Sequence, residues 1–328
     1  MPAGWPDQMA LPTPEMARVR ARCSEIAAGL PDRYAVPIEQ ARTQLLQERA
    51  WWQLEAPAMA SIEHAAMTVD GRPVGLDRFV AHGATAPGCG GPDGVPDDVV
   101  IVYLHGGGWC VGSNATHESI LRRLAHHSRR AVVGVDYSLA PEHPFPAAQD
   151  DVGAAIEYIL ARWPTSGGFV LAGDSAGANL ALVEALRRRD TQRQMPRALM
   201  LFYGVYGRVR PAPSMSRFGD GAFGLSQAAL SRYQSLYLGL APGEEPPRPC
   251  QAFPLEADLR GLPTCMLVAA ELDPLADDSR ELERRLREAA VCCDLHVFAG
   301  LTHGFLSYGR MLPAVDEALV KASTVLAS

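Results

Sequence analysis

The sequence has a single lysine, although arginine is abundant, and it has neither an excess of positive charge nor a long apolar run. Lys321 is the single lysine among 30 basic residues, and 37 acidic residues give the chain a formal net charge of −7. A negatively charged protein does not favour nucleic acid, so none is expected as a partner. No apolar run reaches the roughly 20 residues of a transmembrane helix, so no membrane span is predicted.

The seven cysteines form no pattern of their own. Their number is odd and no two of them have a C-x-x-C spacing, so neither a disulfide framework nor a zinc site is predicted. No other metal or cofactor is expected. Residues 1–7 lack a basic segment followed by an apolar run, so we expect no signal peptide. Together these features predict a reduced, cytoplasmic protein.

The chain does contain short apolar runs that alternate with helical patterns. The apolar runs occupy residues 62–69, 74–82, 99–104, 131–135, 169–172, 198–202, 265–270 and 295–298. The helical patterns occupy residues 116–128, 147–162, 177–189, 276–290 and 311–326. Such alternation is typical of right-handed crossovers in a parallel sheet with helices on both faces. The sequence therefore predicts an α/β fold with an eight-stranded, mostly parallel sheet whose first two strands are antiparallel at one edge.

The first sixty residues precede this alternation and read as helical. A helix is predicted from Thr13, with proline in its first turn, to about residue 30, and a second one over residues 37–53. Trp51 and Trp52 stand near the end of the second helix. They either pack against the core or line a substrate entrance.

A second segment, residues 205–250, interrupts the alternation between two strands. It contains a piece rich in glycine, proline and serine, and an amphipathic helix over residues 226–238. A long insertion at the carboxyl end of a strand is typical of a lid. We therefore expect residues 1–60 and 205–250 to form a helical cap, the latter as an insertion in a catalytic domain over residues 61–328.

A strand, a tight turn and a helix meet at the sequence G-D-S-A-G, residues 173–177. This is the pattern of a nucleophile elbow, in which Ser175 stands at the turn and the glycines make room for the neighbouring strand and helix. The start of the helix behind Ser175 offers unpaired N–H groups where an oxyanion would form. The same five letters also arise by chance in a chain rich in glycine, serine and alanine.

Three consecutive glycines follow the strand that ends at Leu104, in the sequence H-G-G-G-W at residues 105–109. Such a loop can turn its N–H groups into a cleft and stabilise a tetrahedral oxyanion. A phosphate-binding loop is disfavoured, because Val111 occupies the third glycine position and no G-K follows. A plain flexible turn is the other alternative. The position upstream of a nucleophile elbow favours an oxyanion hole.

A serine nucleophile needs a histidine base, and the chain offers two histidines after Ser175. His296 lies within a predicted strand, where a structural role is expected. His303 follows that strand in a loop at its carboxyl end, which is where a base must lie to reach the nucleophile.

The base needs an acid to orient it. Asp273 ends a strand and precedes a proline, which places its carboxylate in the loop beside the expected histidine. Asp277 and Asp278 begin a helix, where acidic residues complement the helix dipole. Glu271 remains the next candidate after Asp273.

These motifs resemble those of the hormone-sensitive-lipase family of esterases, within the α/β hydrolases. The matching stretches lie at residues 105–109, 137–147, 173–179, 273–277 and 303–305. Ser138 and Trp109 depart from the residues that this family usually has at these positions.

The resemblance implies a serine carboxylesterase that hydrolyses short-chain acyl esters without a cofactor. The implied nucleophile is Ser175, the base His303 and the orienting acid Asp273, with an oxyanion hole formed by the N–H groups of Gly107, Gly108 and Ala176. The implied partner is a small-molecule ester, and a homodimer through residues 295–326 is compatible with the family. The alternatives are an amidase or a carbon–oxygen lyase on the same scaffold. A non-catalytic small-molecule receptor is disfavoured because the three residues are present together.

Overall fold

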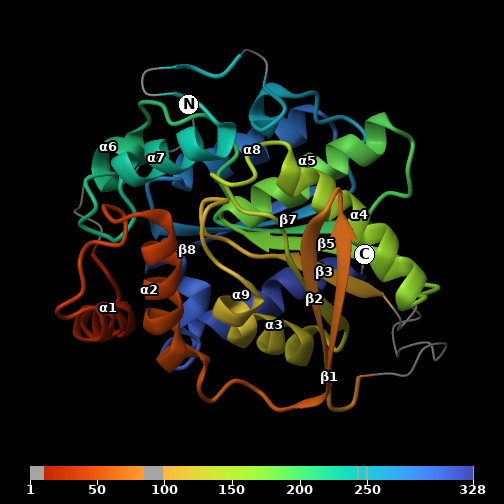
Figure 1. Ribbon diagram of the computed structural model, residues 1–328, viewed down its shortest axis with the longest axis horizontal. Coiled ribbons are helices and arrows are strands. Elements are labelled where there is room, and N and C mark those ends of the chain that lie inside the picture. Colours follow the sequence, from red (N-terminus) through yellow and green to blue (C-terminus); the bar gives the residue numbers. More distant parts are fainter. Residues whose placement is uncertain (1–10, 85–98, 242–243, 248–249, 328) are drawn as a thin grey trace.

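The computed structural model describes residues 11–84, 99–241, 244–247 and 250–327, so residues 1–10 and part of the 205–250 segment lie outside it. Its sheet has eight strands in the order β1-β2-β4-β3-β5-β6-β7-β8 (Figure 1). The strands are β1 (Met59–Val69), β2 (Arg72–Ala81), β3 (Val100–Leu104), β4 (Ala131–Asp136), β5 (Phe169–Asp174), β6 (Ala198–Phe202), β7 (Thr264–Leu272) and β8 (Cys293–Thr302). The β1–β2 and β2–β4 pairs are antiparallel and all other neighbours are parallel. The predicted fold class is confirmed.

Helices cover both faces of this sheet (Figure 1). On one face lie α3 (Asn114–Ser128) and α9 (Ala314–Ser323), and on the other lie α4 (Ala147–Arg162), α5 (Ala176–Asp190) and α8 (Ala276–Glu288). The central strand β3 is apolar on both sides. Val102 and Leu104 face the α4, α5 and α8 core, while Ile101 and Tyr103 face the α3 and α9 core. A strand buried on both faces reads as a continuous apolar run, which is why the sequence predicted it well.

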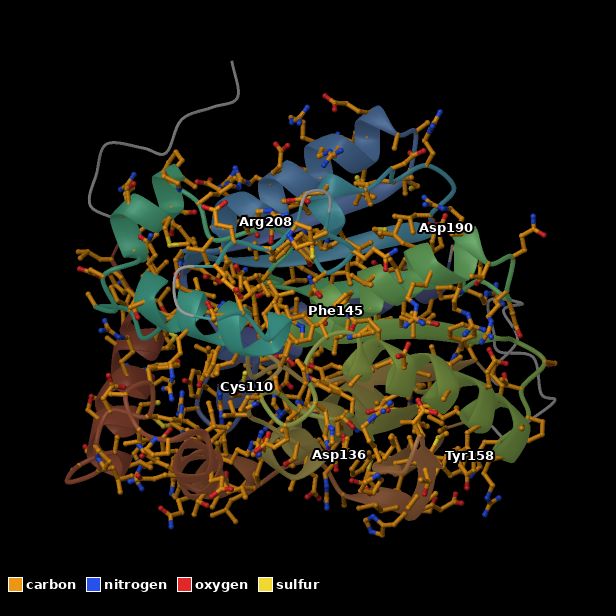
Figure 2. The ribbon with its side chains drawn as sticks, turned by 45° about the horizontal axis from the view of Figure 1, so that its top comes forward. Cys110, Asp136, Phe145, Tyr158, Asp190 and Arg208 are labelled. Atoms are coloured by element: carbon orange, nitrogen blue, oxygen red, sulfur yellow. The ribbon has the colours of Figure 1, made fainter. Side chains whose placement is uncertain are left out.

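Side chains fill the space between the sheet and the helices. Figure 2 shows Cys110 inside the molecule, where it is fully buried, and Asp190 at the outer end of α5. Among the described residues, no helix combines the length and the apolar character needed to cross a bilayer.

Several predicted boundaries were wrong at the ends of elements. The first helix, α1 (Pro14–Ile26), begins as predicted, because Thr13 Oγ1 accepts the N–H of Met16, but it ends before residue 30. Strand β8 is longer than the predicted run 295–298, because it lies at the sheet edge and exposes alternate residues that break the apolar pattern. A short helix, α6 (Pro213–Phe218), forms in a stretch that read as irregular.

The N-terminal helices lie beside the helices of the insertion, although about two hundred residues separate them in the sequence. Helices α1, α2 (Ile38–Ala50), α6 and α7 (Gln227–Leu238) gather on the left of Figure 1. Arg232 of α7 donates to the carbonyl of Val36 at 2.6 Å, and Arg20 of α1 donates to the carbonyl of Ala222. These contacts join the two segments on the side of the sheet where β8 lies.

Candidate active site

Ser175 lies at a strained turn between β5 and α5. Its backbone adopts φ 53° and ψ −116°, a conformation that is uncommon for any residue other than glycine. The N–H of Ser175 donates to the carbonyl of Phe202 at 2.9 Å, which ties the turn to β6. A Cβ atom on Gly177 would lie 1.9 Å from the carbonyl oxygen of Leu104. Only glycine therefore lets α5 begin this close to β3, as the predicted nucleophile elbow requires.

The structure brings Ser175, His303 and Asp273 together in a chain of hydrogen bonds. Ser175 Oγ lies 2.9 Å from His303 Nε2, and His303 Nδ1 lies 2.7 Å from Asp273 Oδ2. Asp273 is fully buried, and its other oxygen accepts the N–H of Leu275 at 2.8 Å. Because a carboxylate only accepts hydrogen bonds, Nδ1 carries the ring proton and Nε2 is free to accept the hydroxyl proton of Ser175.

The other acid candidates are held elsewhere by backbone N–H groups. Glu271 accepts from Gly300, Asp277 from Ser214, and Asp278 from both Tyr206 and Gly207. His296 lies on β8 with Nε2 at 3.1 Å from a carboxylate oxygen of Asp294. The structure does not bring any of these four side chains into the Ser175 hydrogen-bond chain.

The glycine loop after β3 lies beside Ser175. Gly107 and Gly108 have φ values of +124° and +59°, and both line the cavity of about 90 Å³ that Ser175 and His303 also line. A Cβ atom on Gly108 would lie 2.3 Å from the ring of Tyr233, so a side chain there would collide with α7. Ala176 is the first residue of α5, so its N–H has no partner within the helix.

The comparisons with known proteins agree with this architecture. Residues 101–307, more than half of the chain, match the family described as the alpha/beta hydrolase fold. The chain belongs to the α/β hydrolases. It is similar to a solved ester hydrolase from the metagenome of Lake Arreo, with a TM-score of 0.86 and 29% identity over 97% of this chain and 98% of that chain.

Two further solved structures are similar to this chain, and the first of them confirms the resemblance to the hormone-sensitive-lipase family. An esterase of the bacterial hormone-sensitive lipase family matches with a TM-score of 0.80 and 29% identity, over 96% of this chain and 97% of that chain. A thermostable carboxylesterase cloned from a metagenomic library matches with a TM-score of 0.80 and 30% identity, over 89% of this chain and 97% of that chain.

A buried carboxylate, to which sequence reasoning gave no role, anchors the glycine loop of this α/β hydrolase. Asp174 Oδ1 accepts the hydroxyl of Tyr103 at 2.8 Å and the N–H of Gly106 at 2.9 Å, and it lies 3.5 Å from His117 Nε2. Burial opposes the charged form, but the attraction of His117 and these hydrogen bonds outweigh it and lower the pKa of Asp174 to about 2. The sequence signal for this role was a charged residue directly before Ser175, at the end of an otherwise apolar run.

Replacing Asp174 with alanine is expected to destabilise this α/β hydrolase by about 3 kcal/mol or more, because the Tyr103 hydroxyl and the Gly106 N–H lose their buried acceptor. Urea unfolding at pH 7 measures the loss. Asp190→Ala, at an exposed aspartate, is the control and should change the free energy of unfolding by less than about 0.5 kcal/mol.

The difference in stability between wild type and Asp174→Ala is expected to depend on pH. Because the pKa of Asp174 is lowered on folding, its stabilisation is present above the ordinary pKa of about 4 and is lost as the pH falls toward 2. The difference between wild type and Asp174→Ala should therefore shrink on acidification. A difference that grows toward low pH would contradict the assigned contacts.

An outer cavity of about 490 Å³ opens over His303 and is lined mainly by α1, α2 and the insertion. Trp52 lines this cavity and contacts Tyr308, with ring centroids 4.8 Å apart. Trp51 instead packs between the guanidinium groups of Arg22 and Arg310. Both tryptophans therefore pack against the core, Trp52 as one of its buried members and Trp51 at its edge, and Trp52 also lines the cavity.

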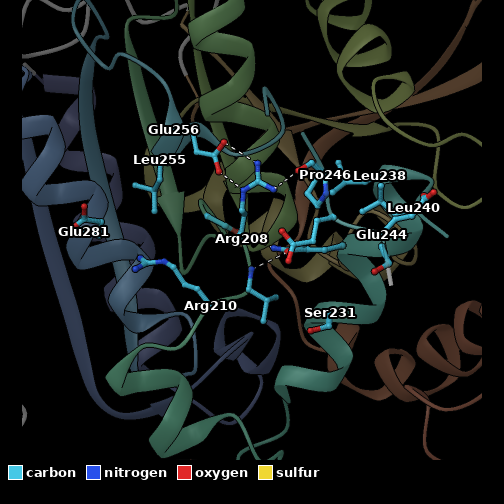
Figure 3. Close-up of a pocket in the computed structure, with 15 residues that line it drawn as sticks. Arg208, Arg210, Ser231, Leu238, Leu240, Glu244, Pro246, Leu255, Glu256 and Glu281 are labelled. Atoms are coloured by element: carbon cyan, nitrogen blue, oxygen red, sulfur yellow. Dashed lines mark hydrogen bonds and ion pairs between the residues drawn. The ribbon is translucent and has the colours of Figure 1, made fainter. Parts of the chain in front are cut away.

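Another cavity of about 490 Å³ lies between α7, α8 and the segment after β6, and it contains none of the predicted site residues (Figure 3). Arg208 points into it, but Glu256 binds its guanidinium and the carbonyl of Pro246 accepts from it at 3.0 Å. The charge of Arg208 is thus satisfied within the protein. Across the described ranges, no group of three or more His, Cys, Asp or Glu side chains is arranged to hold a metal ion.

Proposed function

We propose that this protein is a serine carboxylesterase in which Ser175 is the nucleophile, His303 the base and Asp273 the orienting acid. That it is a carboxylic ester hydrolase follows from the family and from solved relatives described as esterases. The assignment of residues rests on one observation, the 2.9 Å contact from Ser175 Oγ to His303 Nε2 at a strained strand-to-helix turn.

In the proposed reaction, Ser175 Oγ attacks the ester carbonyl carbon as its proton moves to His303 Nε2. The N–H groups of Gly107, Gly108 and Ala176 donate to the oxyanion of the tetrahedral intermediate. The bond to the alcohol oxygen then breaks, and His303 gives its proton to the leaving alcohol. Water attacks the acyl-serine by the same steps and releases the acid and the free Ser175 hydroxyl.

The size of the inner cavity supports short acyl chains. Its volume of about 90 Å³ lies far below the roughly 300–1,000 Å³ of pockets that hold drug-sized ligands. Its lining includes the charged Arg33 and Arg49 and the apolar or aromatic side chains of Trp109, Leu225, Leu230 and Tyr233. The indole of Trp109 is fixed by stacking on Tyr237, with centroids 4.3 Å apart, so the wall does not yield easily to a longer chain.

We further propose that the N-terminal helices and the insertion form a cap over this site, as the sequence analysis expected. The hydrogen bond between α7 and the segment before α2 supports a single cap formed by both parts of the chain. The cytoplasmic location and the homodimer through residues 295–326 stay predictions.

A series of p-nitrophenyl esters tests the acyl preference. We expect kcat/KM to be highest for acetate or butyrate and to fall by about tenfold or more at octanoate. Extra methylenes forced into a filled cavity cost about 1–3 kcal/mol, and about 1.4 kcal/mol corresponds to a factor of ten in rate. Leu230→Ala, which enlarges the inner cavity, should move the optimum toward longer chains. Leu46→Ala, on the exposed side of α2, is the control.

A palmitate ester that reacts faster than the butyrate would overturn the short-chain proposal. The anilide of butyric acid, measured beside the p-nitrophenyl ester, distinguishes an esterase from an amidase. We expect the ester to react and the anilide to react far more slowly.

A further inference from the structure

The lining of the outer cavity is positively charged, although the protein as a whole is negatively charged. Four charged side chains from α1, α2 and the turn between them line it: Arg20, Arg33, Glu48 and Arg49. Three arginines and one glutamate give 3 − 1 = +2, within a protein whose net charge is −7. A cationic cavity in an anionic protein concentrates negatively charged ligands.

Each oxygen of the one carboxylate in this group already accepts a hydrogen bond. Glu48 Oε1 accepts from the amide of Gln44 at 2.8 Å, and its Oε2 binds the guanidinium of Arg33. Arg33 also donates to the hydroxyl of Tyr34 at 3.2 Å. Glu48 is therefore paired with Arg33, and among the described residues no carboxylate forms an ion pair with Arg49.

Among the residues that the structure describes, neither Arg20 nor Arg49 has a carboxylate partner, but Arg20 donates to the carbonyl of Ala222, whereas Arg49 has an unsatisfied donor. The guanidinium of Arg49 lies 5.5 Å from the ring centroid of Tyr308. Its Nη1 atom is shielded from solvent and has no hydrogen-bond partner among the residues that the structure describes. A charged donor held away from water without an acceptor is unfavourable, and an incoming anion removes that cost.

Arg49 is also placed where a substrate must lie. It lines both the inner cavity, with Ser175 and His303, and the outer cavity that opens above them. The inner cavity has room for a short acyl group only, so the alcohol part of an ester bound at Ser175 extends into the outer one. Arg49 is thus within the volume that the alcohol part would occupy.

We infer that the preferred substrates are short-chain acyl esters of hydroxycarboxylic acids, whose carboxylate Arg49 binds. This inference rests on the proposed esterase function and adds the class of alcohol to it. The planar fork of a guanidinium matches the two oxygens of a carboxylate, and one unpaired guanidinium matches one negative charge. Arg49 is a specificity-determining residue in this assignment and takes no part in acyl transfer.

The test compares two acetyl esters of nearly equal size, 4-acetoxybenzoate and the neutral 4-acetoxybenzamide. We expect the kcat/KM of wild type to favour the anionic ester. Arg49→Gln should lower the ratio of anionic to neutral kcat/KM by about tenfold to a hundredfold, mainly through KM, because it removes a charge-assisted pair. Arg49→Lys should restore part of the ratio, since it keeps the charge but not the fork.

Arg18→Gln is the matched control. Arg18 also lies on the N-terminal helices, but its side chain is 62% exposed, pairs with Glu15 and does not line either cavity. Its loss removes the same charge at a distance from the substrate and should leave the ratio unchanged. An equal fall of the ratio in Arg18→Gln and Arg49→Gln would overturn the assignment to Arg49.

Binding to an inactive protein separates this inference from the esterase proposal. Calorimetry on Ser175→Ala compares 4-hydroxybenzoate with 4-hydroxybenzamide, and the double variant Ser175→Ala/Arg49→Gln should weaken binding of the benzoate by about tenfold or more. If wild type hydrolyses p-nitrophenyl butyrate but neither the ratio nor this binding responds to Arg49, the carboxylate inference fails alone. If wild type hydrolyses no ester, the proposed function itself fails.

Discussion

Ser175→Ala is expected to lower kcat for p-nitrophenyl butyrate by about 10⁴- to 10⁶-fold, the range found when a serine nucleophile that acts with a histidine is removed. The physical reason is that Ser175 Oγ is the atom that forms the covalent acyl intermediate, and alanine has no substitute for it. The strained turn and the glycine loop remain, so substrate binding should persist and KM should change far less than kcat.

Stopped-flow release of p-nitrophenol checks this prediction. Wild type should show an initial burst equal to the enzyme concentration whenever deacylation is the slower step, and Ser175→Ala should show none. Ser216→Ala, an exposed serine on α6, is the control and should retain full activity. Equal thermal unfolding midpoints show that the variant has folded, and activity within tenfold of wild type in Ser175→Ala would exclude the proposed mechanism.

The fold was predictable from sequence where burial is uniform. Strands β3 and β5 are buried along their whole length, so their apolar runs mark them almost residue by residue. Strand β8 was predicted too short, because its outer half exposes alternate residues and the edge of a sheet imposes no apolar run. The end of α1 and the helix α6 depend on contacts with distant segments, which no local pattern encodes.

The candidate site was predictable to the extent that topology alone determines it. Parallel strands end at the same edge of a sheet, so side chains directly after β5, β7 and β8 must meet there, and Ser175, Asp273 and His303 do. The sequence marks Asp174 as a polar residue in an apolar run, but it does not identify the partners of Asp174 or the surroundings of Arg49. The role of Asp174 depends on the hydroxyl and N–H groups that donate to it from neighbouring segments. The role of Arg49 depends on the hydrogen bonds that Glu48 accepts from Gln44 and Arg33.

Asp273→Asn is expected to lower kcat by about 10⁴-fold with little change in stability, as in other triads where the acid is replaced by its amide. Asp273 Oδ2 now accepts the Nδ1 proton of His303 at 2.7 Å. If the amide nitrogen takes that position it donates instead, so Nδ1 must lose its proton to accept. The ring proton then moves to Nε2, which can no longer take the proton of Ser175.

Glu271→Gln provides the matched comparison, since Glu271 is the alternative acid and lies two residues before Asp273, near the end of β7. Its carboxylate accepts the N–H of Gly300 at 2.7 Å, and a glutamine oxygen can keep that bond, so activity should stay within about threefold of wild type. A larger loss in Glu271→Gln than in Asp273→Asn would move the orienting role to Glu271. Because both substitutions remove one negative charge at neighbouring positions, a difference between them reports the hydrogen bond to His303 and not the change in net charge.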